Sequence, residues 1–324
     1  MNKNIVIVAG EPYSVFLEIL FKSIKLKKIK KPFILICSKK LLISQMKKLN
    51  YNIKINSINK HKIKDIKLLK NYINVLDIKF HFKKTFDKIT NNSSKYIENC
   101  FDEGLRLIKI GKTKILINGP VSKKHFLKKK FLGITEYIAK KSGKKSQEVM
   151  LIYNKKLSVS PITTHLPLQD VKKNITTKKI IKNVITINSF FKDKLKKKPK
   201  FAITGLNPHC ETNKNFSEEE KIILPAINKL KKKNININGP FAADTLFLKK
   251  NINKFNVVIG MYHDQVLTPI KTLYEFKAFN ITLGLPFLRM TPDHGPNNCM
   301  LGKNRSDPSS MIEMFKFLSQ IREN

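Results

Sequence analysis

Three histidines each follow an apolar, strand-like run within a few residues, and together they could bind a metal ion. They are His165 in SPITTHLPLQD, His209 in FAITGLNPHC and His263 in VVIGMYHDQ. Imidazole nitrogens are common ligands of divalent metals, and a three-histidine site leaves coordination positions open for substrate or water. Any one of them alone is more simply explained as a partly exposed loop residue. Their repeated position at strand ends favours a shared metal site.

Two aspartates accompany these histidines. Asp264 directly follows His263, and Asp244 lies in GPFAADTLF. Either carboxylate could orient a ligand imidazole or accept a proton from a substrate. Each could equally cap a helix, because Asp244 precedes an apolar run and Asp264 stands where a helix is expected to start. Both roles remain open for both residues.

Lys271, Asn280 and Arg289 lie close together in the sequence and suit an anionic substrate. Arg289 is conspicuous because only four of the 64 basic residues are arginine. It follows the strand-like run GLPFL, and a guanidinium can bind a carboxylate or a phosphate through two parallel hydrogen bonds. Lys271 shares a segment with His263, which distinguishes it from the other lysines. The alternative is an ordinary surface lysine.

The formal net charge of +41 raises the question of nucleic-acid binding. Arginine, which suits phosphate and guanine best, is scarce, and the lysines are scattered in short groups such as KLKKIKK and KLKKKPK. We therefore expect a solvated lysine coat and no specific nucleic-acid partner. Non-specific attraction to polyanions at low salt is the expected side effect.

The composition also bounds the location of the chain. No run of about 18 apolar residues is present, so neither a transmembrane helix nor a membrane partner is expected. The start, MNKNIVIVAGEP, lacks the cleavage site of a signal peptide and predicts a first core strand. Cys37, Cys100, Cys210 and Cys299 are far apart, which favours free thiols in a reducing cytoplasm.

Strand-like segments alternate with helical patterns, which predicts an α/β fold. Helices are expected over 93–112, 176–195 and 217–233. Near-continuous apolar strands indicate mostly parallel sheets with both faces covered, whose ligands bind beyond the carboxyl ends of the strands. No G-x-G-x-x-G, G-x-x-x-x-G-K-[ST], G-x-S-x-G or H-E-x-x-H motif occurs, so a Rossmann or P-loop enzyme is not predicted.

A series of motifs runs in order between about residues 115 and 310. They are INGPVSK, FLGITEY, ITTHLPLQDV, GLNPH, NGPFAADTLF, MYHDQVL, FNITLGLPFLR, DHG and LGKNRSDPSS. The series resembles the 4-hydroxythreonine-4-phosphate dehydrogenase family of vitamin B6 biosynthesis. VAGEP and Glu18 are similar to the N-terminal loop of that family.

The resemblance implies a fold like that of isocitrate and isopropylmalate dehydrogenases. Two α/β/α domains with mostly parallel sheets are expected, with the active site in the interdomain cleft at the interface of a homodimer. Residues 1–120 with 285–324 are expected to form the cofactor-side domain. Residues 121–284 are expected to form the second domain, which supplies the metal, substrate and dimer contacts.

The resemblance also implies roles for individual residues. The expected metal ligands are His165, His209 and His263, the last completing the site of the partner subunit. The expected substrate-binding residues are Thr135, Lys271, Asn280 and Arg289. The expected cofactor-binding residues are Asp293, His294, Gly295 and Gly302, and the candidate catalytic groups are Lys271, Asp264 and Asp244.

The implied reaction is the oxidation of 4-phosphooxy-L-threonine by NAD or NADP, followed by decarboxylation to 3-amino-2-oxopropyl phosphate. One divalent metal (zinc, magnesium or cobalt) would lower the pKa of the substrate hydroxyl and polarise the carbonyl that forms. The chain would then be a cytoplasmic oxidoreductase of pyridoxal phosphate biosynthesis that acts on a small phosphorylated hydroxy amino acid.

Three positions depart from the pattern of the family. Its Gly-His-Thr-Glu is here Gly133-Ile134-Thr135-Glu136, its glycine-rich N-terminal loop is GEPYSVFLE, and its Asp-His-Gly-Thr-Ala is DHGPN. Pro296 in DHGPN lacks an N–H beside the expected cofactor. Ile134 keeps open a dehydrogenase of another phosphorylated four-carbon hydroxy acid, of the 4-phospho-threonate or erythronate type. The charge keeps open a polyanion-binding protein on a degenerate enzyme scaffold.

Overall fold

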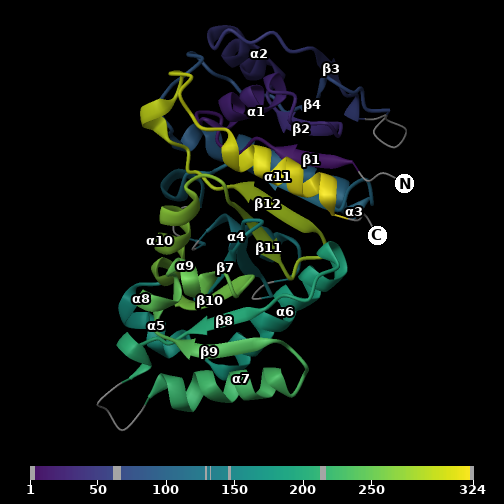
Figure 1. Cartoon of the computed structure of the whole chain (residues 1–324). Helices are drawn as coiled ribbons and strands as arrows, with labels where there is room; N and C mark the ends of the chain where they lie inside the picture. Colours follow the sequence, from purple (N-terminus) through teal and green to yellow (C-terminus); the bar gives the residue numbers. More distant parts are fainter. Residues whose placement is uncertain are drawn as a thin grey trace. The chain divides into compact units, whose positions relative to one another are not determined.

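Apolar strands alternate with helices along the chain in the computed structural model, which describes residues 4–60, 67–127, 130–131, 133–144, 147–211 and 217–321 (Figure 1). The chain divides into two compact units. The first comprises the described residues of Met1–Glu148 and Leu285–Glu323, and the second comprises those of Val149–Gly284. Within the described ranges, no helix has both the length and the apolarity to cross a membrane.

The first unit is built on a sheet whose paired strands are parallel. Its strands, in spatial order, are β3 (Ile55–Ser57), β4 (Ile73–Asp77), β2 (Phe33–Cys37), β1 (Ile5–Val8), β5 (Ile115–Asn118) and β12 (Leu288–Pro292). Every residue of β1, β2 and β5 is buried. Such continuous apolar runs are what a strand needs when helices cover both faces of the sheet.

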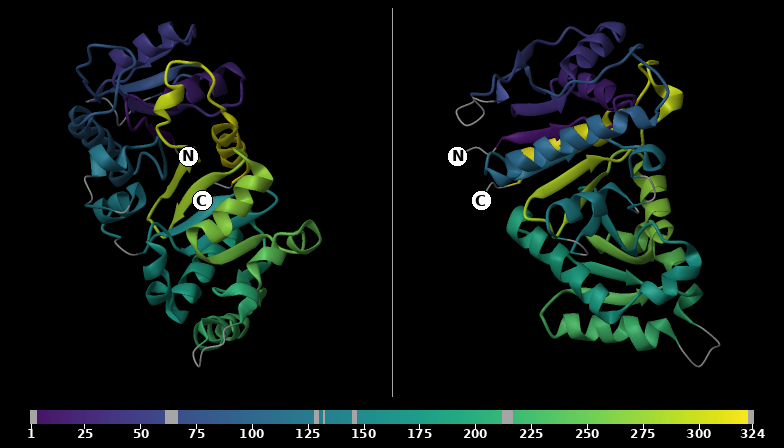
Figure 2. Two further views of the ribbon diagram at one scale, coloured as in Figure 1. Left: turned by 90° about the vertical axis from the view of Figure 1, so that its left-hand side faces the viewer. Right: turned by 180° about the vertical axis from the view of Figure 1, so that it is seen from behind.

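Helices cover both faces of this sheet (Figure 2). The helices are α1 (Phe16–Lys25), α2 (Lys39–Lys48), α3 (Ser94–Lys109), α4 (Ile134–Lys141) and α11 (Ser309–Gln320), with the short turns η2 (Asn91–Ser93), η3 (Lys123–Leu127) and η6 (Asn298–Met300). Phe101 of α3 and Tyr137 of α4 pack with Val6 and Val8 of β1 on one face. On the other face, Phe315 of α11 lies against Phe33 of β2.

The second unit carries a mixed but mostly parallel sheet. Its strands, in spatial order, are β11 (Phe279–Leu283), β6 (Val149–Tyr153), β7 (Ser158–Thr163), β10 (Val257–Tyr262), β8 (Phe201–Thr204) and β9 (Ile237–Phe241). Among these strands β6 alone runs antiparallel to its neighbours β11 and β7. The mostly parallel α/β architecture predicted from the sequence is therefore confirmed.

Helices also flank the second sheet. They are α5 (Leu168–Asn174), α6 (Thr177–Leu195), α7 (Leu224–Lys231), α8 (Ala243–Leu246), α9 (Lys249–Ile252) and α10 (His263–Tyr274), with the turns η4 (Pro208–Cys210) and η5 (Glu219–Ile223). Val266 and Ile270 of α10 pack on Val159 of β7 and Val258 of β10. This packing fixes α10, and with it His263, at the end of β10.

The segment 121–148 belongs to the first unit by its packing. Val121, Leu127, Tyr137 and Ile138 join the hydrophobic core around α3, and the second unit begins at Val149. The sequence placed this boundary near residue 121, where the density of motifs rises. Motif density follows the chemistry of a site, whereas the boundary follows the burial of apolar side chains. The functional assignment of each domain stays a prediction.

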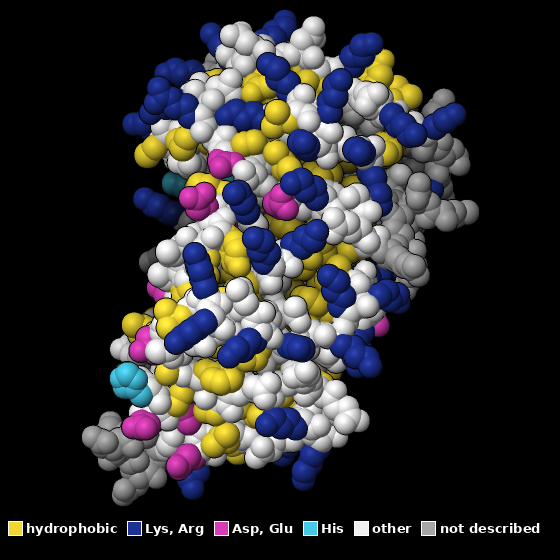
Figure 3. All heavy atoms as spheres, viewed as in Figure 1, with side chains coloured by type: hydrophobic (Ala, Val, Ile, Leu, Met, Phe, Trp, Pro, Cys, Tyr) yellow, Lys and Arg dark blue, Asp and Glu magenta, His cyan; other side chains and the backbone are white. Residues whose placement is uncertain are grey.

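Lysine side chains are spread widely over the surface. On the face shown in Figure 3, they are distributed over both units and are not gathered into a single stripe. A dedicated nucleic-acid site would be expected to present a continuous basic surface. This face therefore supports the interpretation of the lysines as a solvated coat.

The ends of β1 and β5 approach each other closely in the first unit. The N–H of Gly119 donates to the carbonyl oxygen of Val8, and the N–H of Glu11 donates to the carbonyl oxygen of Pro120 at 2.9 Å. A Cβ added at Gly119 would lie 2.1 Å from the carbonyl oxygen of Ala9 and 2.8 Å from the ring of Phe16. Neither the backbone nor a buried ring can move away easily, so only glycine fits here.

We predict that Gly119→Ala destabilises the protein by about 1–3 kcal/mol, because the added methyl overpacks a buried junction. Gly295→Ala is the matched control, since no atom lies within 4 Å of a Cβ added there. Its effect should stay within about 0.5 kcal/mol. Equilibrium unfolding in urea measures both, and equal stabilities for the two variants would contradict the close packing.

Candidate active site

Polar side chains gather at the carboxyl ends of strands in each unit. In the first unit, Asn118 ends β5, and Asp293 directly follows β12. In the second unit, His165 and His263 follow β7 and β10 within two residues. Ligands of open α/β sheets bind at this edge, which makes these residues the first candidates for a site.

Arg289 is buried in the first unit, and its contacts include hydrogen bonds to two neutral side chains. Its Nε donates to Oδ1 of Asn118 at 2.8 Å, and its Nη1 donates to Oγ1 of Thr135 at 2.7 Å. Asn118 comes from the adjacent strand β5, and Thr135 from the first turn of α4. The sequence paired Arg289 with Thr135 as substrate-binding residues, and the structure brings these two together.

Arg289 is only 1% exposed, and charged side chains are rarely buried so completely. Burial lowers the pKa of Arg289 to about 9, and the nearby carboxylate of Glu136 opposes this shift. The guanidinium therefore remains charged at neutral pH. A buried charge costs several kcal/mol unless an opposite charge offsets it. Two nitrogens of Arg289 donate to neutral oxygens, which orient the guanidinium. Such a group suits an anionic ligand such as a phosphate.

Lys271 and Asn280, the other expected substrate-binding residues, lie in the second unit. Lys271 is in the last turn of α10, where its Nζ is 5.9 Å from the ring centroid of Phe276. Asn280 is on β11, and its Oδ1 is buried without a hydrogen-bond partner in the described part of the chain. A buried amide oxygen without a partner is destabilising, so it is suited to a donor on a ligand.

His165 and His263 lie side by side in the second unit. Their strands are parallel neighbours in which Thr163 pairs with Tyr262, and the centroids of the two imidazole rings are 5.6 Å apart. Nδ1 of His263 is 2.6 Å from Oδ1 of Asp264. Donation from Nδ1 to this carboxylate leaves Nε2 as the nitrogen that could bind a metal.

His209 does not join this pair to form a complete site. Across the described ranges, no group of three His, Cys, Asp or Glu side chains is arranged to hold a metal ion within one chain. The donors that are present fit a divalent metal in chemical type, because two imidazoles stand together and one is oriented by a carboxylate. A metal bound by His165 and His263 would need at least one further ligand.

The loop that carries His209 is strained and firmly held. His209 and Cys210 both have left-handed backbone conformations, with φ of 55° and 63°. Glu219 restrains the loop: its Oε1 accepts from the N–H groups of Leu206 and Asn207, at 2.8 and 2.9 Å. Strain of this kind persists only where surrounding contacts fix it, and it is common at functional sites.

Gln265 links this loop to the end of β10. Its Nε2 donates to the carbonyl oxygen of Gly205 at 2.7 Å, and its Oε1 accepts from the N–H of Met261 at 2.7 Å. Neither Glu219 nor Gln265 was predicted from the sequence to have a positioning role, because Glu219 lies in an expected helix start. Asn207 lies 12 residues from Glu219 and Gly205 lies 60 residues from Gln265, so no local pattern could reveal these two contacts.

The two aspartates differ in their surroundings. Asp264 contacts His263, as the sequence suggested for a residue that orients an imidazole. Asp244 is exposed in the first turn of α8, and its Oδ1 accepts from the N–H of Thr245 at 2.9 Å. Asp244 places a negative charge in the first turn, but the N-cap of α8 is Ala242 and no side chain caps this helix. Both suggested roles of Asp244 stay predictions.

The expected cofactor residues lie along one segment of the first unit. The N–H of Asp293 donates to Oγ of Ser310, and the ring of His294 lies 6.3 Å from that of Phe16. The carbonyl oxygen of Pro296 accepts from the N–H of Val15 at 3.1 Å, so this proline anchors the segment although it lacks an N–H. Gly295 has open space around it, which fits close approach of a cofactor.

Glu11 is a buried carboxyl group that the sequence did not identify as a candidate. It follows the end of β1, is 2% exposed, and its Oε2 accepts from Oγ of Ser93 at 3.2 Å. Burial raises the pKa of Glu11 to about 7, against the opposing effects of Ser93 and the N–H of Tyr13. The folded protein therefore keeps this carboxyl largely protonated below neutral pH.

We predict that Glu11 makes the wild type less stable as the pH rises from 4.5 to 7. The unfolded chain releases this proton near pH 4.5, whereas the folded protein holds it until about pH 7, so ionisation opposes folding. The upper bound of this effect is roughly 3 kcal/mol. Glu11→Gln should remove it and raise the melting temperature at pH 8, while the exposed control Glu220→Gln should not. Parallel pH profiles for wild type and Glu11→Gln would contradict the buried ionisation.

Comparison with known proteins identifies the family. The model of the family described as "Pyridoxal phosphate biosynthetic protein PdxA" matches residues 28–318. A 4-hydroxythreonine-4-phosphate dehydrogenase from Sulfurihydrogenibium sp. (strain YO3AOP1) is 42% identical over 319 residues, covering 96% of this chain and 95% of its own.

Solved structures share the fold. The crystal structure of 4-hydroxythreonine-4-phosphate dehydrogenase from Klebsiella pneumoniae has a TM-score of 0.80 at 23% identity, with 98% of this chain and 99% of that chain covered. Isocitrate dehydrogenase from Methylococcus capsulatus has a TM-score of 0.51 at 10% identity, covering 98% and 86%. The fold expected from the sequence is confirmed. Because the family match spans most of its length, this chain belongs to the PdxA family of pyridoxal phosphate biosynthetic proteins.

Proposed function

We propose that this chain is a 4-hydroxythreonine-4-phosphate dehydrogenase. It oxidises 4-phosphooxy-L-threonine with NAD or NADP, and the product loses CO2 to give 3-amino-2-oxopropyl phosphate for pyridoxal phosphate biosynthesis. The observation that carries this proposal is the end-to-end similarity to relatives named for that enzyme. The buried, charged Arg289 supports it, because a guanidinium suits the phosphate of such a substrate.

The substrate phosphate is held by Arg289 and Thr135 of the first unit in this proposal. The hydrogen bond from Nε of Arg289 to Asn118 fixes the orientation of the guanidinium plane. The direction of the other N–H groups is fixed with it. Lys271 and Asn280 are the other proposed substrate-binding residues: the lysine supplies a second cation, and Oδ1 of Asn280 is suited to accept from a hydroxyl or ammonium group. The cation lowers the cost of bringing the phosphate out of water.

His165, His209 and His263 are the proposed metal ligands. When bound, the metal would stabilise negative charge on the substrate oxygen during oxidation and decarboxylation. Asp264 orients the ring of His263 through the 2.6 Å contact to Nδ1. Lys271 and Asp264 are the two proposed candidates for accepting the hydroxyl proton, and Lys271 can accept it only after it has released its own proton and no longer serves as a cation. Asp244 is a third candidate, whose Oδ1 already accepts from the N–H of Thr245.

NAD or NADP is the proposed hydride acceptor, held by the segment from Asp293 to Gly302. Gly295 offers open space for close approach, and His294 packs beside Phe16 at the start of α1. The enzyme works as a cytoplasmic homodimer in this proposal, with active sites shared between subunits. The metal prediction requires this sharing, because one chain does not bring three ligands together in its described residues.

A rate assay with two substrates tests the function. Purified protein, a divalent metal and NAD+ or NADP+ are mixed with 4-phosphooxy-L-threonine or with 4-phospho-D-erythronate, and reduced nicotinamide is followed by absorbance. Faster turnover of the amino acid supports the proposal. Faster turnover of the erythronate supports the second candidate, for which Ile134 is the motivating residue: it packs partly buried against the first-unit core, where the family has a polar histidine. No turnover of either, with salt-sensitive binding of nucleic acid, would support the polyanion-binding alternative.

We predict that Arg289→Lys lowers kcat/KM for the phosphorylated substrate about 100-fold, which corresponds to roughly 2.7 kcal/mol. Lysine keeps the charge but cannot reach both Asn118 and Thr135 and still present a planar fork. Arg106→Lys is the matched control, because Arg106 also makes paired bonds, to Glu103, but on the surface of α3. The control should change kcat/KM less than twofold. Equal values for the two variants would remove Arg289 from the substrate site.

Mixed dimers test which subunit supplies each metal ligand. We predict that combining His165→Ala and His263→Ala subunits restores up to half of the activity and bound metal, because one of the two shared sites is then intact. Combining His165→Ala with His209→Ala should restore nothing. The reverse pattern would show that His165 and His263 bind in the same chain, as their 5.6 Å separation also permits, and that the partner subunit supplies His209.

A further inference from the structure

We propose that Glu18 and Lys22 of α1 are positioning residues for the nicotinamide cofactor. They hold the chain immediately after the expected cofactor segment, residues 293–302, and so fix the conformation in which that segment binds. The inference rests on the proposed function, because it takes that segment as the cofactor loop. It adds two residues that do not themselves belong to the loop.

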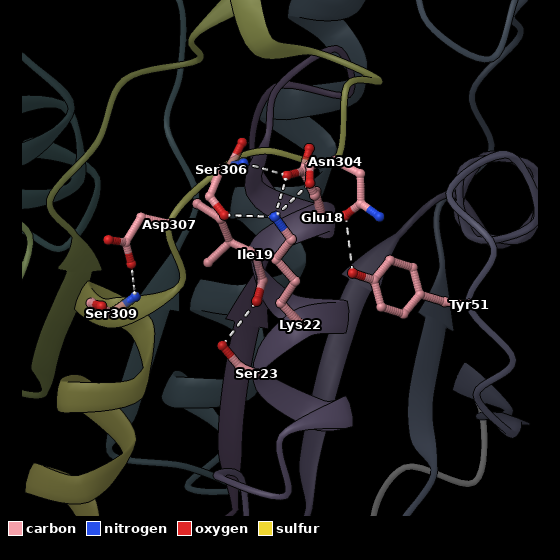
Figure 4. Close-up of polar contacts among 9 residues, drawn as sticks. All are labelled: Glu18, Ile19, Lys22, Ser23, Tyr51, Asn304, Ser306, Asp307 and Ser309. Atoms are coloured by element: carbon pink, nitrogen blue, oxygen red, sulfur yellow. Dashed lines mark hydrogen bonds and ion pairs between the residues drawn. The ribbon is translucent and has the colours of Figure 1, made fainter.

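The contacts form a closed polar cluster between α1 and residues 304–306 (Figure 4). Oε1 of Glu18 accepts from the N–H of Ser306 at 2.6 Å and from Nζ of Lys22 at 2.9 Å. Nζ of Lys22 also donates to the carbonyl oxygens of Asn304, at 3.0 Å, and Ser306, at 2.7 Å. One ion pair therefore binds both a donor and two acceptors of the same short piece of backbone.

This ion pair differs from an ordinary surface salt bridge. Glu18 is 2% exposed, and the side chain of Lys22 is 17% exposed. Exposed pairs contribute about 0–1 kcal/mol, whereas charges taken out of water must be hydrogen-bonded to be tolerated. Here the hydrogen bonds go to backbone groups of 304–306, which lie outside any helix or strand and lack the partners that regular structure supplies.

The same helix anchors the other end of the loop. The N–H of Val15, at the start of α1, donates to the carbonyl oxygen of Pro296 at 3.1 Å. Between these two anchors, residues 297–299 and 302–305 are exposed. Gly302 has φ of 77°, and a Cβ there would lie 2.9 Å from the ring of Phe86. The exposed stretch is thus held at both ends by contacts with α1. It also contains a left-handed position that favours glycine, Gly302.

Tyr51 adds a third restraint at the far anchor. Its hydroxyl donates to Oδ1 of Asn304 at 3.0 Å, and Asn304 itself has φ of 55°. These contacts reach across more than 250 residues of sequence, so they are part of the tertiary structure and not of a local turn. A loop fixed in this way before binding loses less conformational entropy when it binds a ligand, which strengthens affinity without adding a contact.

Calorimetric titration with NAD+ or NADP+, whichever the wild type reduces, tests the positioning role. Glu18→Gln and Lys22→Met should each raise Kd about tenfold, while Lys22→Arg, which keeps the charge and the donors, should stay within about threefold of the wild type. Glu313→Gln is the matched control, because it removes a carboxylate from an exposed pair with Lys316 on α11 of the same unit. It should leave Kd unchanged.

Hydrogen exchange gives a readout that does not depend on the cofactor. In Glu18→Gln the amides of residues 297–306 should exchange faster, and the amides of β1 and β5 should not change; Glu313→Gln should change neither set. Faster exchange with an unchanged Kd would reduce the cluster to a structural role and overturn the proposal. If Glu18→Gln fails to fold, the Kd values of Lys22→Met and Lys22→Arg decide. Equal Kd values for these two variants would overturn the proposal.

The two proposals fail differently. A wild type that binds neither NAD+ nor NADP+ contradicts the proposed function and, with it, the cofactor role of the loop. A wild type that turns over normally while Glu18→Gln and Lys22→Met bind the cofactor equally well contradicts only the positioning role.

Discussion

The guanidinium of Arg289 is buried, and the structure around it is arranged to keep a positive charge inside a protein. Strand β5 supplies Asn118, helix α4 supplies Thr135, and both accept from the guanidinium. These neutral oxygens orient the group. Glu136 lies near enough to oppose the fall in its pKa, yet burial raises the pKa of Glu136 in turn. A guanidinium oriented in this way suits a phosphate, which is why we propose that the phosphate of the substrate binds here.

The scaffold explains how such a group can be held accurately. Arg289 lies on β12, which pairs with the fully buried parallel strand β5. Gly119, directly after β5, packs so closely against the end of β1 that no side chain fits there. Residues on strands of a packed sheet move less than residues on loops, so the position of the charge is set by the core. The cofactor segment is different: it is irregular and exposed, and it depends on anchors such as Glu18 and Lys22.

Much of the fold could be predicted from the sequence because its signals are local. Continuous apolar strands and amphipathic helices indicated a mostly parallel α/β protein, and the structure confirms it. The boundary at Val149 could not be predicted, since it depends on Tyr137 and Ile138 packing with α3. Arg289 could be identified because arginine is rare in this chain. His165 and His263 could be identified because both follow strands, and the structure brings these two histidines together.

Other parts of the site could not be seen in the sequence because their causes are tertiary. Glu11 was not identified as a candidate, and its pKa is raised by burial, which the contact with Ser93, 82 positions away, opposes. Glu219 looked like a helix start, although it restrains the loop of His209. The resemblance to the family gave roles to several residues, but one chain does not assemble three metal ligands in its described ranges, so the metal site stays a prediction about the dimer.

The most direct measurement of the central claim is a calorimetric titration of the wild type with 4-phosphooxy-L-threonine and with its dephosphorylated form, 4-hydroxy-L-threonine, in the presence of a divalent metal. The buried charge of Arg289 predicts that the phosphate improves Kd by about 100-fold or more, roughly 2.7 kcal/mol. Equal affinity for the two ligands would contradict the account, because the guanidinium of Arg289 would then not bind the phosphate.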